Sequence, residues 1–574
     1  MKRESHLSPP TQDARPVAGA ELDLRERPHP ARQTADSVRG GYPLVICIAL
    51  LLAAGAWLRW PFLRNGLWRD EASSVYIARS TSLRQFIGRA GQDYNPPLFT
   101  AVLALFVKAA GYEESAVKAF GYFIGMAALI SIVVLAFRIG GPGAALLAAA
   151  LAASHPLLIL MAAEVRPYSL TLLLAALALA SMGRLSTKVR ASSAGQRLFV
   201  ALALILLAYS HYSGTLAVIA IGSAALIALA FRSADRAWRT ILAGSLAAGA
   251  LLLFWAPAAR AQLEVGQPWR FSSAWNTRWP QIESAAGHLL PLFPSGLAAV
   301  LLLACAPVAL LVALRLEGGS ARAFALTVAV MLSTWLVLGF FRTEPRYFTV
   351  SAGLACAVAA ALPFRCIEIL PDRWRTPARR LAPGLIALFV FLGSTACERR
   401  IPRADVPKSG IRAASLDGRL PRGGFVVAAP DYLVPTVWYY GAPQECLRGF
   451  ARWEPSLVPE FRNYRELWTN AAAVDETLDA IEAELRSIGE KRFWIVSENS
   501  VWANPLRLQE RSARLVEAAA ARFDRVAAHD YPGYFEPVIV TEFSLRPPAE
   551  TAAASTVRRE TSSPESRPPA AGQP

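Results

Sequence analysis

The chain has 574 residues, of which 54% are hydrophobic and 18% charged, and its mean hydropathy is +0.33. Apolar runs long enough to cross a bilayer recur through about the first 400 residues, which excludes a wholly soluble enzyme and indicates a multi-pass membrane protein. The net charge of +16 does not indicate nucleic-acid binding, because lysine and arginine collect in short loops between the apolar runs, as the positive-inside rule describes.

The six cysteines are scattered, and none has a Cys/His spacing typical of a zinc site. Only Cys397 and Cys446 follow the apolar region, so a disulfide between them is one option for an outer compartment.

The chain begins with a polar, proline-rich segment, residues 1–41, which predicts a disordered cytoplasmic tail. The first apolar run, Tyr42–Leu58, is typical of an uncleaved membrane anchor. Ten further runs follow: Ala119–Phe137, Gly143–Met161, Tyr168–Met182, Leu198–Tyr212, Gly214–Phe231, Ile241–Pro257, His288–Leu314, Ala323–Phe341, Tyr347–Pro363 and Leu381–Ala396.

Three arginine-rich loops set the orientation: residues 183–197, 231–239 and 365–380. Their positive charge places them in the cytoplasm. The count of spans agrees with this only if Leu98–Ala110, which contains Lys108, lies in the outer interface or re-enters the bundle. That run is shorter than the ~20 residues that a span needs. We therefore expect eleven spans, a cytoplasmic N-terminus and a C-terminus outside a plasma (inner) membrane.

The composition changes after Cys397, and residues 398–548 predict a small α/β domain on the extracytoplasmic, periplasmic side. Three segments are typical of strands (residues 424–429, 491–497 and 537–543), and residues 472–488 have helical apolar spacing. The last segment, residues 549–574, is rich in Pro, Ser, Ala and Glu and predicts disorder. The predicted transmembrane domain covers residues 42–397.

Ionisable side chains are costly at membrane depth, ~2.5–3.5 kcal/mol each on insertion scales, so those beside the outer loops are candidates for function. Acids and arginines recur on this one side, at the ends of several spans, as expected of a helix bundle that builds one polar site. The set is Asp70, Glu71 and Asp93 in the first outer loop, Glu164 and Arg166 in the second, His211 and Tyr212 in the third, and Glu344 and Arg346 in the fifth.

Each candidate also has a structural interpretation. Asp70 and Glu71 could stabilise the N-terminus of a helix over residues 72–80, since acids there contribute ~0.3–1 kcal/mol. Glu164 with Arg166 could be an interfacial ion pair, and Arg346 an interface anchor. His211 could be a packed histidine, and Asn95-Pro96-Pro97 could simply interrupt a helix. Their joint occurrence on one side favours a functional site.

The ordered set of short motifs resembles the GT-C superfamily of membrane glycosyltransferases, and most closely the branch related to protein O-mannosyltransferases and lipid A aminoarabinose transferases. The resemblance covers about residues 42–365. The motifs are Asp70-Glu71 after the first span, Asn95-Pro-Pro-Leu98, Glu164-Val-Arg-Pro-Tyr168, His211-Tyr212 and Pro345-Arg-Tyr347. The branch usually has histidine before Pro-Pro-Leu, where this chain has Asn95.

The resemblance implies transfer of a sugar from a polyprenyl-phosphate donor to a lipid, polysaccharide or protein acceptor on the outer side, with inversion. A base must take the proton of the acceptor hydroxyl, and we expect Asp70 to be that base. Guanidinium groups match phosphate oxygens, which favours Arg166 and Arg346 as donor-phosphate ligands. Glu71 and Glu164 are further catalytic candidates, Asp93, Asn95, His211, Tyr212 and Tyr168 are expected to bind substrate, and Asp70 and Glu164 would hold a divalent metal ion if the reaction uses one.

A transporter or lipid flippase is the main alternative. Transporters commonly have internal repeats and helices broken near the midplane, whereas here the charges gather at one surface and an outer domain follows. A receptor or assembly scaffold is a third alternative, but eleven spans with repeated outer acids exceed what an anchor requires. The sequence therefore predicts a transferase most strongly.

Overall fold

The computed structural model describes residues 42–185, 193–231, 236–265, 278–315, 318–341, 344–369, 406–450, 473–499 and 508–546, with isolated positions between them. Within these residues six helices are long and apolar enough to cross a membrane. The candidate spans contain α2 (Tyr42–Arg59), α6 (Glu114–Ser154), α10 (Tyr212–Phe231), α11 (Arg236–Leu252), α15 (Gly319–Phe340) and α16 (Thr349–Ile369), and the span that begins with α11 continues through the single turn η2 (Leu253–Trp255) into the next helix. Shorter helices complete the apolar region: α7 (Pro156–Ala162), α8 (Tyr168–Met182), α9 (Ala194–Ser210), α12 (Ala256–Val265), α13 (Arg278–Leu289) and α14 (Ser295–Arg315).

The predicted apolar runs up to residue 363 lie mainly in these helices, which confirms a mostly helical membrane protein. Helix α6 consists of two helical segments that meet at a kink, where the backbone of Gly141 is non-helical (φ 78°), and the two runs that were predicted as separate spans lie on either side of that kink. Glycine tolerates this conformation, and Pro142 then fits the first turn of the second half. The run at residues 381–396 lies almost entirely outside the described residues, so the count of eleven spans and the orientation of the ends stay predictions.

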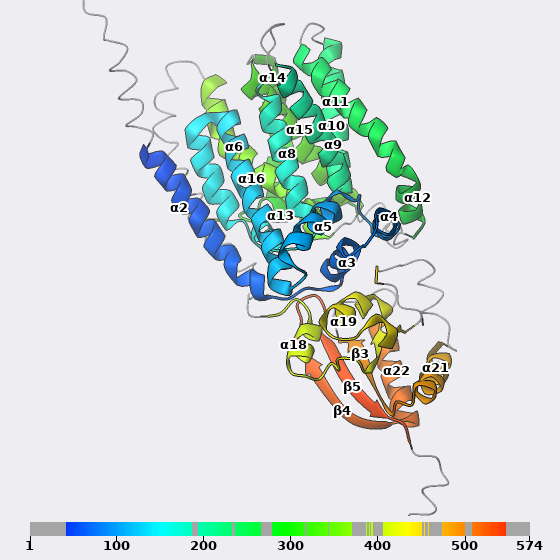
Figure 1. Cartoon of the computed structure of the whole chain (residues 1–574). Coiled ribbons are helices and arrows are strands. Elements are labelled where there is room, and N and C mark those ends of the chain that lie inside the picture. The colour runs from blue at the N-terminus through cyan, green and yellow to red at the C-terminus, as the bar shows by residue number, and fades with distance from the viewer. Residues whose placement is uncertain are drawn as a thin grey trace, which may run out of the picture. The chain divides into compact units, whose positions relative to one another are not determined.

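Helix α6 packs against α8 and α16 in the main apolar core, and the three helices lie side by side in Figure 1. The backbone from Ala162 to Glu164 also approaches α6 closely, because two residues of α6 are glycines. A Cβ atom at Gly121 would lie 2.9 Å from the carbonyl oxygen of Glu164, and one at Gly125 would lie 2.5 Å from that of Ala162. Small residues four apart allow such contact between membrane helices. The backbone just before the second outer motif is therefore pressed against α6.

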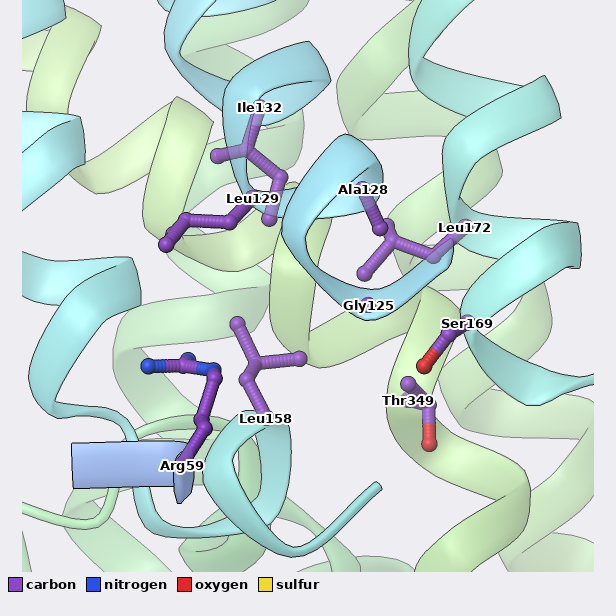
Figure 2. Close-up of a pocket in the computed structure, with 9 residues that line it drawn as sticks. All are labelled: Arg59, Gly125, Ala128, Leu129, Ile132, Leu158, Ser169, Leu172 and Thr349. Atoms are coloured by element: carbon purple, nitrogen blue, oxygen red, sulfur yellow. The ribbon is translucent and has the colours of Figure 1, made fainter. Parts of the chain in front are cut away.

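A small cavity lies among these helices, between Gly125 of α6, Ser169 of α8 and Thr349 of α16 (Figure 2). Its volume of about 10 Å³ has room for roughly one water molecule, too little for a substrate. Arg59 also borders it and donates hydrogen bonds to the carbonyl oxygens of Ala152 and Ala153, where the cation stabilises the C-terminal end of α6.

The predicted first outer loop folds into four helical elements: η1 (Trp60–Arg64), α3 (Arg69–Ala78), α4 (Leu83–Gln92) and α5 (Leu98–Ala110). Helix α5 has the predicted bounds and ends at Gly111, whose φ of 89° stops it. Its 13 residues are fewer than the ~20 that a span needs, in agreement with the predicted helix that does not cross the bilayer.

The C-terminal part contains a five-stranded sheet in the order β2-β1-β3-β5-β4. The strands are β1 (Phe425–Ala429), β2 (Leu447–Gly449), β3 (Arg492–Glu498), β4 (Asp524–Tyr531) and β5 (Val538–Ser544), visible in part in Figure 1. Strands β1, β2 and β3 are parallel, whereas β5 runs antiparallel to β3 and β4. The helices of this part are α18 (Gly410–Leu416), α19 (Val434–Tyr440), α21 (Ala473–Ile488) and α22 (Leu508–Arg522), with the single turns η6 (Asp431–Leu433) and η7 (Gln444–Cys446).

The three predicted strands and the predicted helix are confirmed as β1, β3, β5 and α21. The edge strands β2 and β4 were not predicted, since β2 has three residues and β4 is largely polar and mostly exposed. The predicted domain boundaries stay predictions. Cys446 has a free thiol, and Cys397 lies outside the described residues.

Candidate functional site

The site is built around the first turn of α3, which begins one residue after Trp68 and carries Asp70 and Glu71. The Asp70 side chain keeps 20% of its surface exposed. One of its carboxylate oxygens lies 3.5 Å from a guanidinium nitrogen of Arg346 and the other 3.8 Å from Nε of Arg69. Asp70 is thus an accessible carboxylate between two cations.

Glu71 has the opposite environment, because its side chain is fully buried. Its carboxylate accepts hydrogen bonds from the backbone N–H groups of Trp68 (3.3 Å) and Val165 (2.8 Å). It also pairs with the ammonium groups of Lys118 (3.1 Å) and Lys408 (3.0 Å). Burial alone would raise the pKa of Glu71, but the two ammonium groups lower it overall. The helix-capping alternative therefore describes Glu71 well, and its carboxylate is saturated.

Glu164 follows α7 in the second outer loop and is 1% exposed. Its carboxylate pairs with the Lys408 ammonium, which lies 3.6 Å from Oε1. Neither carboxylate oxygen has a hydrogen-bond partner among the described residues. Burial raises the pKa of Glu164, and the positive charge of Lys408 opposes that effect. A buried carboxylate without hydrogen bonds is energetically costly, which makes Glu164 a candidate for a functional role.

Arg166 connects the second outer loop to the first. Its guanidinium donates to the backbone carbonyl of Asp70 and to Oγ of Ser74, each at 3.1 Å. It also lies 3.6 Å from the carboxylate of Asp93, which accepts a 3.3 Å hydrogen bond from the Asn95 amide. Asp93 and Asn95 therefore belong to the same polar cluster, although they face Arg166 rather than Asp70.

Arg346 comes from η5 (Pro345–Phe348), immediately before α16. It lies 2.8 Å from Glu344 and 3.5 Å from Asp70, and its guanidinium stands 4.6 Å from the centroid of the Trp68 ring. The side chain is nearly buried. A planar cation held in this way beside Asp70 can receive a phosphate edge on its remaining N–H groups.

The aromatic candidates form a separate group. Tyr168, His211 and Tyr347 place their ring centroids 5.4–5.7 Å apart. His211 is buried, and its Nδ1 contacts the Ser213 hydroxyl at 2.8 Å, which supports the packed-histidine alternative. Tyr212 donates its hydroxyl proton to Gln262.

Three buried residues in this region were not predicted: Lys118, Lys408 and Glu536. Lys118 stands near the start of an apolar helix, a position that could have signalled a buried partner. Lys408 and Glu536 are distant from Glu71 in the chain, and nothing in the sequence connects them to it. Glu536 accepts hydrogen bonds from the Arg69 N–H (2.9 Å) and the Thr436 hydroxyl (3.0 Å), and burial raises its pKa to about 7.

Metal binding was one expectation for Asp70 and Glu164. Within the described part of the chain, no three or more His, Cys, Asp or Glu residues form a group that could hold an ion. Arg346 stands beside Asp70 and Lys408 beside Glu164. These cations compete with a divalent ion for the same oxygens, so the residues as arranged do not fit a metal site.

Comparison with known proteins identifies solved structures of similar fold. No family model and no curated protein matches the chain. Among solved structures, ArnT from Cupriavidus metallidurans in the apo state is similar with TM-score 0.51 and 13% identity, over 88% of this chain and 98% of that one. The Archaeoglobus fulgidus oligosaccharyltransferase tethered with an acceptor peptide is similar with TM-score 0.50 and 11% identity, over 85% of this chain and 73% of that one. Over most of its length, therefore, the chain is similar in fold to these two proteins, both of which are GT-C membrane glycosyltransferases.

Proposed function

We propose that this protein is a membrane glycosyltransferase that moves a sugar from a polyprenyl-phosphate donor to a hydroxyl group of a lipid, glycan or protein acceptor. The observation that carries the proposal is the pairing of one accessible carboxylate, Asp70, with a buried arginine, Arg346, 3.5 Å away. This pair combines a proton acceptor with a cation able to bind phosphate. The fold shared with ArnT agrees with it.

In the proposed reaction, Asp70 accepts the proton of the acceptor hydroxyl as its oxygen attacks the anomeric carbon. The bond from that carbon to the phosphate oxygen breaks, and the polyprenyl phosphate leaves with the bonding electrons. Arg346 stabilises the leaving phosphate, because charge-assisted bidentate hydrogen bonds are strongest to developing anions. Attack from the side opposite the phosphate inverts the anomeric centre.

The other polar residues are assigned by their contacts. Arg166 holds the Asp70 backbone through its carbonyl oxygen and so fixes the position of the base. Glu71, whose carboxylate is saturated, positions α3 rather than reacting. Asp93 and Asn95 support Arg166, Tyr168 and His211 pack against one another as aromatic groups that would bind substrate, and Tyr212 would bind substrate beside Gln262. The outer face of the membrane is the proposed location of the site, since it lies in the predicted outer loops.

The test is direct transfer. Membranes that contain the full chain are incubated with a series of labelled polyprenyl-phosphate sugars, and lipid, glycan and protein fractions are analysed for label. Asp70→Asn should lower kcat by at least about a hundredfold, within the range of general-base catalysis, at normal abundance. Glu113→Gln, at an exposed carboxylate in the same loop, is the matched control. Full activity of Asp70→Asn would refute the base assignment, and no transfer from any donor would favour transport.

A further inference from the structure

Lys408 connects the C-terminal part of the chain to the proposed active site. Its backbone is held from both sides. The Lys408 N–H donates to the carbonyl oxygen of Asn65 (2.7 Å), and its own carbonyl accepts from the N–H groups of Phe535 (2.9 Å) and Glu536 (3.1 Å). These bonds join the loop before α3 to the loop before β5 through one residue.

The side chain of Lys408 is 7% exposed, and its ammonium stands between two carboxylates, 3.0 Å from Glu71 and 3.6 Å from Glu164. Together with Lys118 these residues form a buried cluster of two cations and two anions. The positive charges of Arg346 and Lys118 also act on Glu164, and its carboxylate interacts electrostatically with the Tyr534 hydroxyl. Lys408 is the cation of this group that the C-terminal part supplies.

The same contact region also fixes the first turn of α3. The Glu536 carboxylate accepts from the Arg69 N–H at 2.9 Å, so it satisfies a free donor at the helix start. The rings of Trp68 and Phe535 stack with centroids 4.5 Å apart and planes at 25°. Asp70 therefore lies in a turn whose backbone is bound by residues from the C-terminal part.

We propose that Lys408 is a positioning residue of the transferase site, which holds the Asp70 turn in place through Glu71 and orients the Glu164 carboxylate. The inference rests on the proposed function, because it assigns Lys408 a part in that reaction. It follows that the site is complete only when the C-terminal part is docked.

The test compares Lys408→Met with Arg412→Gln in the full chain, reconstituted in lipid nanodiscs. Arg412 also joins the C-terminal part to the start of α6, through Glu114 at 2.9 Å, but among the described residues it forms no ion pair with Glu71 or Glu164. We expect Lys408→Met to lower kcat at least about tenfold, equivalent to about 1.4 kcal/mol, with the donor KM changed less than about threefold. Its acidic limb of activity should move to higher pH, since Glu164 loses its nearest cation. Lys408→Arg should recover part of kcat, and Arg412→Gln should keep the wild-type kcat and pH profile.

Each outcome decides a different question. A Lys408→Met protein with wild-type kcat and pH profile, or an equal loss in Arg412→Gln, would overturn the positioning role while leaving the transferase intact. Absence of transfer by the wild type would overturn the proposed function and this inference with it. If Lys408→Met does not accumulate, Lys408→Met/Glu71→Gln is compared with Glu71→Gln alone, because the double variant restores the charge balance. A further fall in kcat supports the role, and equal kcat values overturn it.

Discussion

Glu71→Gln should destabilise the protein more than any other single change to a carboxylate of the first outer loop. The substitution keeps the shape of the side chain but removes its charge. The buried cluster then holds the ammonium groups of Lys118 and Lys408 against Glu164 alone, and one cation is left without a counter-ion. The two backbone N–H groups that bind the Glu71 carboxylate retain only one amide oxygen as acceptor.

The magnitude follows from the cost of breaking a buried ion pair, about 3–5 kcal/mol when one partner is removed. Glu71 and Lys118 are both fully buried, so solvent screening does not reduce this figure. Replacing both members of a buried pair with apolar groups is often close to neutral. Glu71→Met/Lys118→Met should therefore recover most of the stability that Glu71→Gln loses.

The assay is the melting temperature and membrane abundance of the detergent-solubilised full chain. Glu71→Gln should melt at least about 5 °C below the wild type, since each kcal/mol shifts the midpoint by a few degrees. The exposed Glu113→Gln should not change it. A Glu71→Gln protein as stable as Glu113→Gln, or a double variant less stable than Glu71→Gln, would refute the buried charge cluster as the source of stability.

Three further changes test other parts of the site. The wild-type melting temperature should fall as pH rises through about 7, because the pKa of Glu536 is raised in the folded protein. The stabilising contribution of Glu536 is complete below the ordinary pKa of 4.5 and is lost as the buried carboxyl ionises. Glu536→Gln should remove this dependence of the melting temperature on pH, and an unchanged dependence would contradict the assignment. Gly125→Val should lower the free energy of unfolding by about 1–3 kcal/mol and lower transferase activity, because a Cβ atom there would lie 2.5 Å from the backbone of Ala162. Gly249→Val is the control, because a Cβ atom there has no neighbour within 4 Å. Equal melting temperatures of the two variants would refute the close contact. Arg346→Lys should raise the donor KM about tenfold or more, because lysine lacks the planar fork that binds phosphate in two places; unchanged kinetics would remove Arg346 from the donor site.

The elements with strong local signals could be predicted from the sequence. Apolar runs show which segments become membrane helices because transfer into a bilayer depends on composition. The short helix α5 was predicted from its apolar run, and β1, β3 and β5 from their apolar composition. Edge strands such as β4 were not predicted, because a mostly exposed strand needs no apolar pattern.

The candidate site was predicted in part. Asp70, Arg166, Arg346, Asp93 and Asn95 lie in one polar region, as their positions beside the outer loops suggested. The different environments of Asp70 and its neighbour Glu71 could not be predicted, because adjacent residues in a helix turn point in different directions and only packing decides which one is buried.

The sequence by itself determined that this protein is a helical membrane protein with acids and arginines at the ends of several apolar helices and an α/β C-terminal part, because hydrophobicity and charge act locally along the chain. Only the tertiary structure decided which charges meet. Lys408 pairs with Glu71 across 337 positions of the chain, and no local pattern records such a contact. Burial then determines that Glu71 is a structural anchor while Asp70 stays accessible, because a carboxylate without solvent must take its hydrogen bonds and counter-ions from the fold.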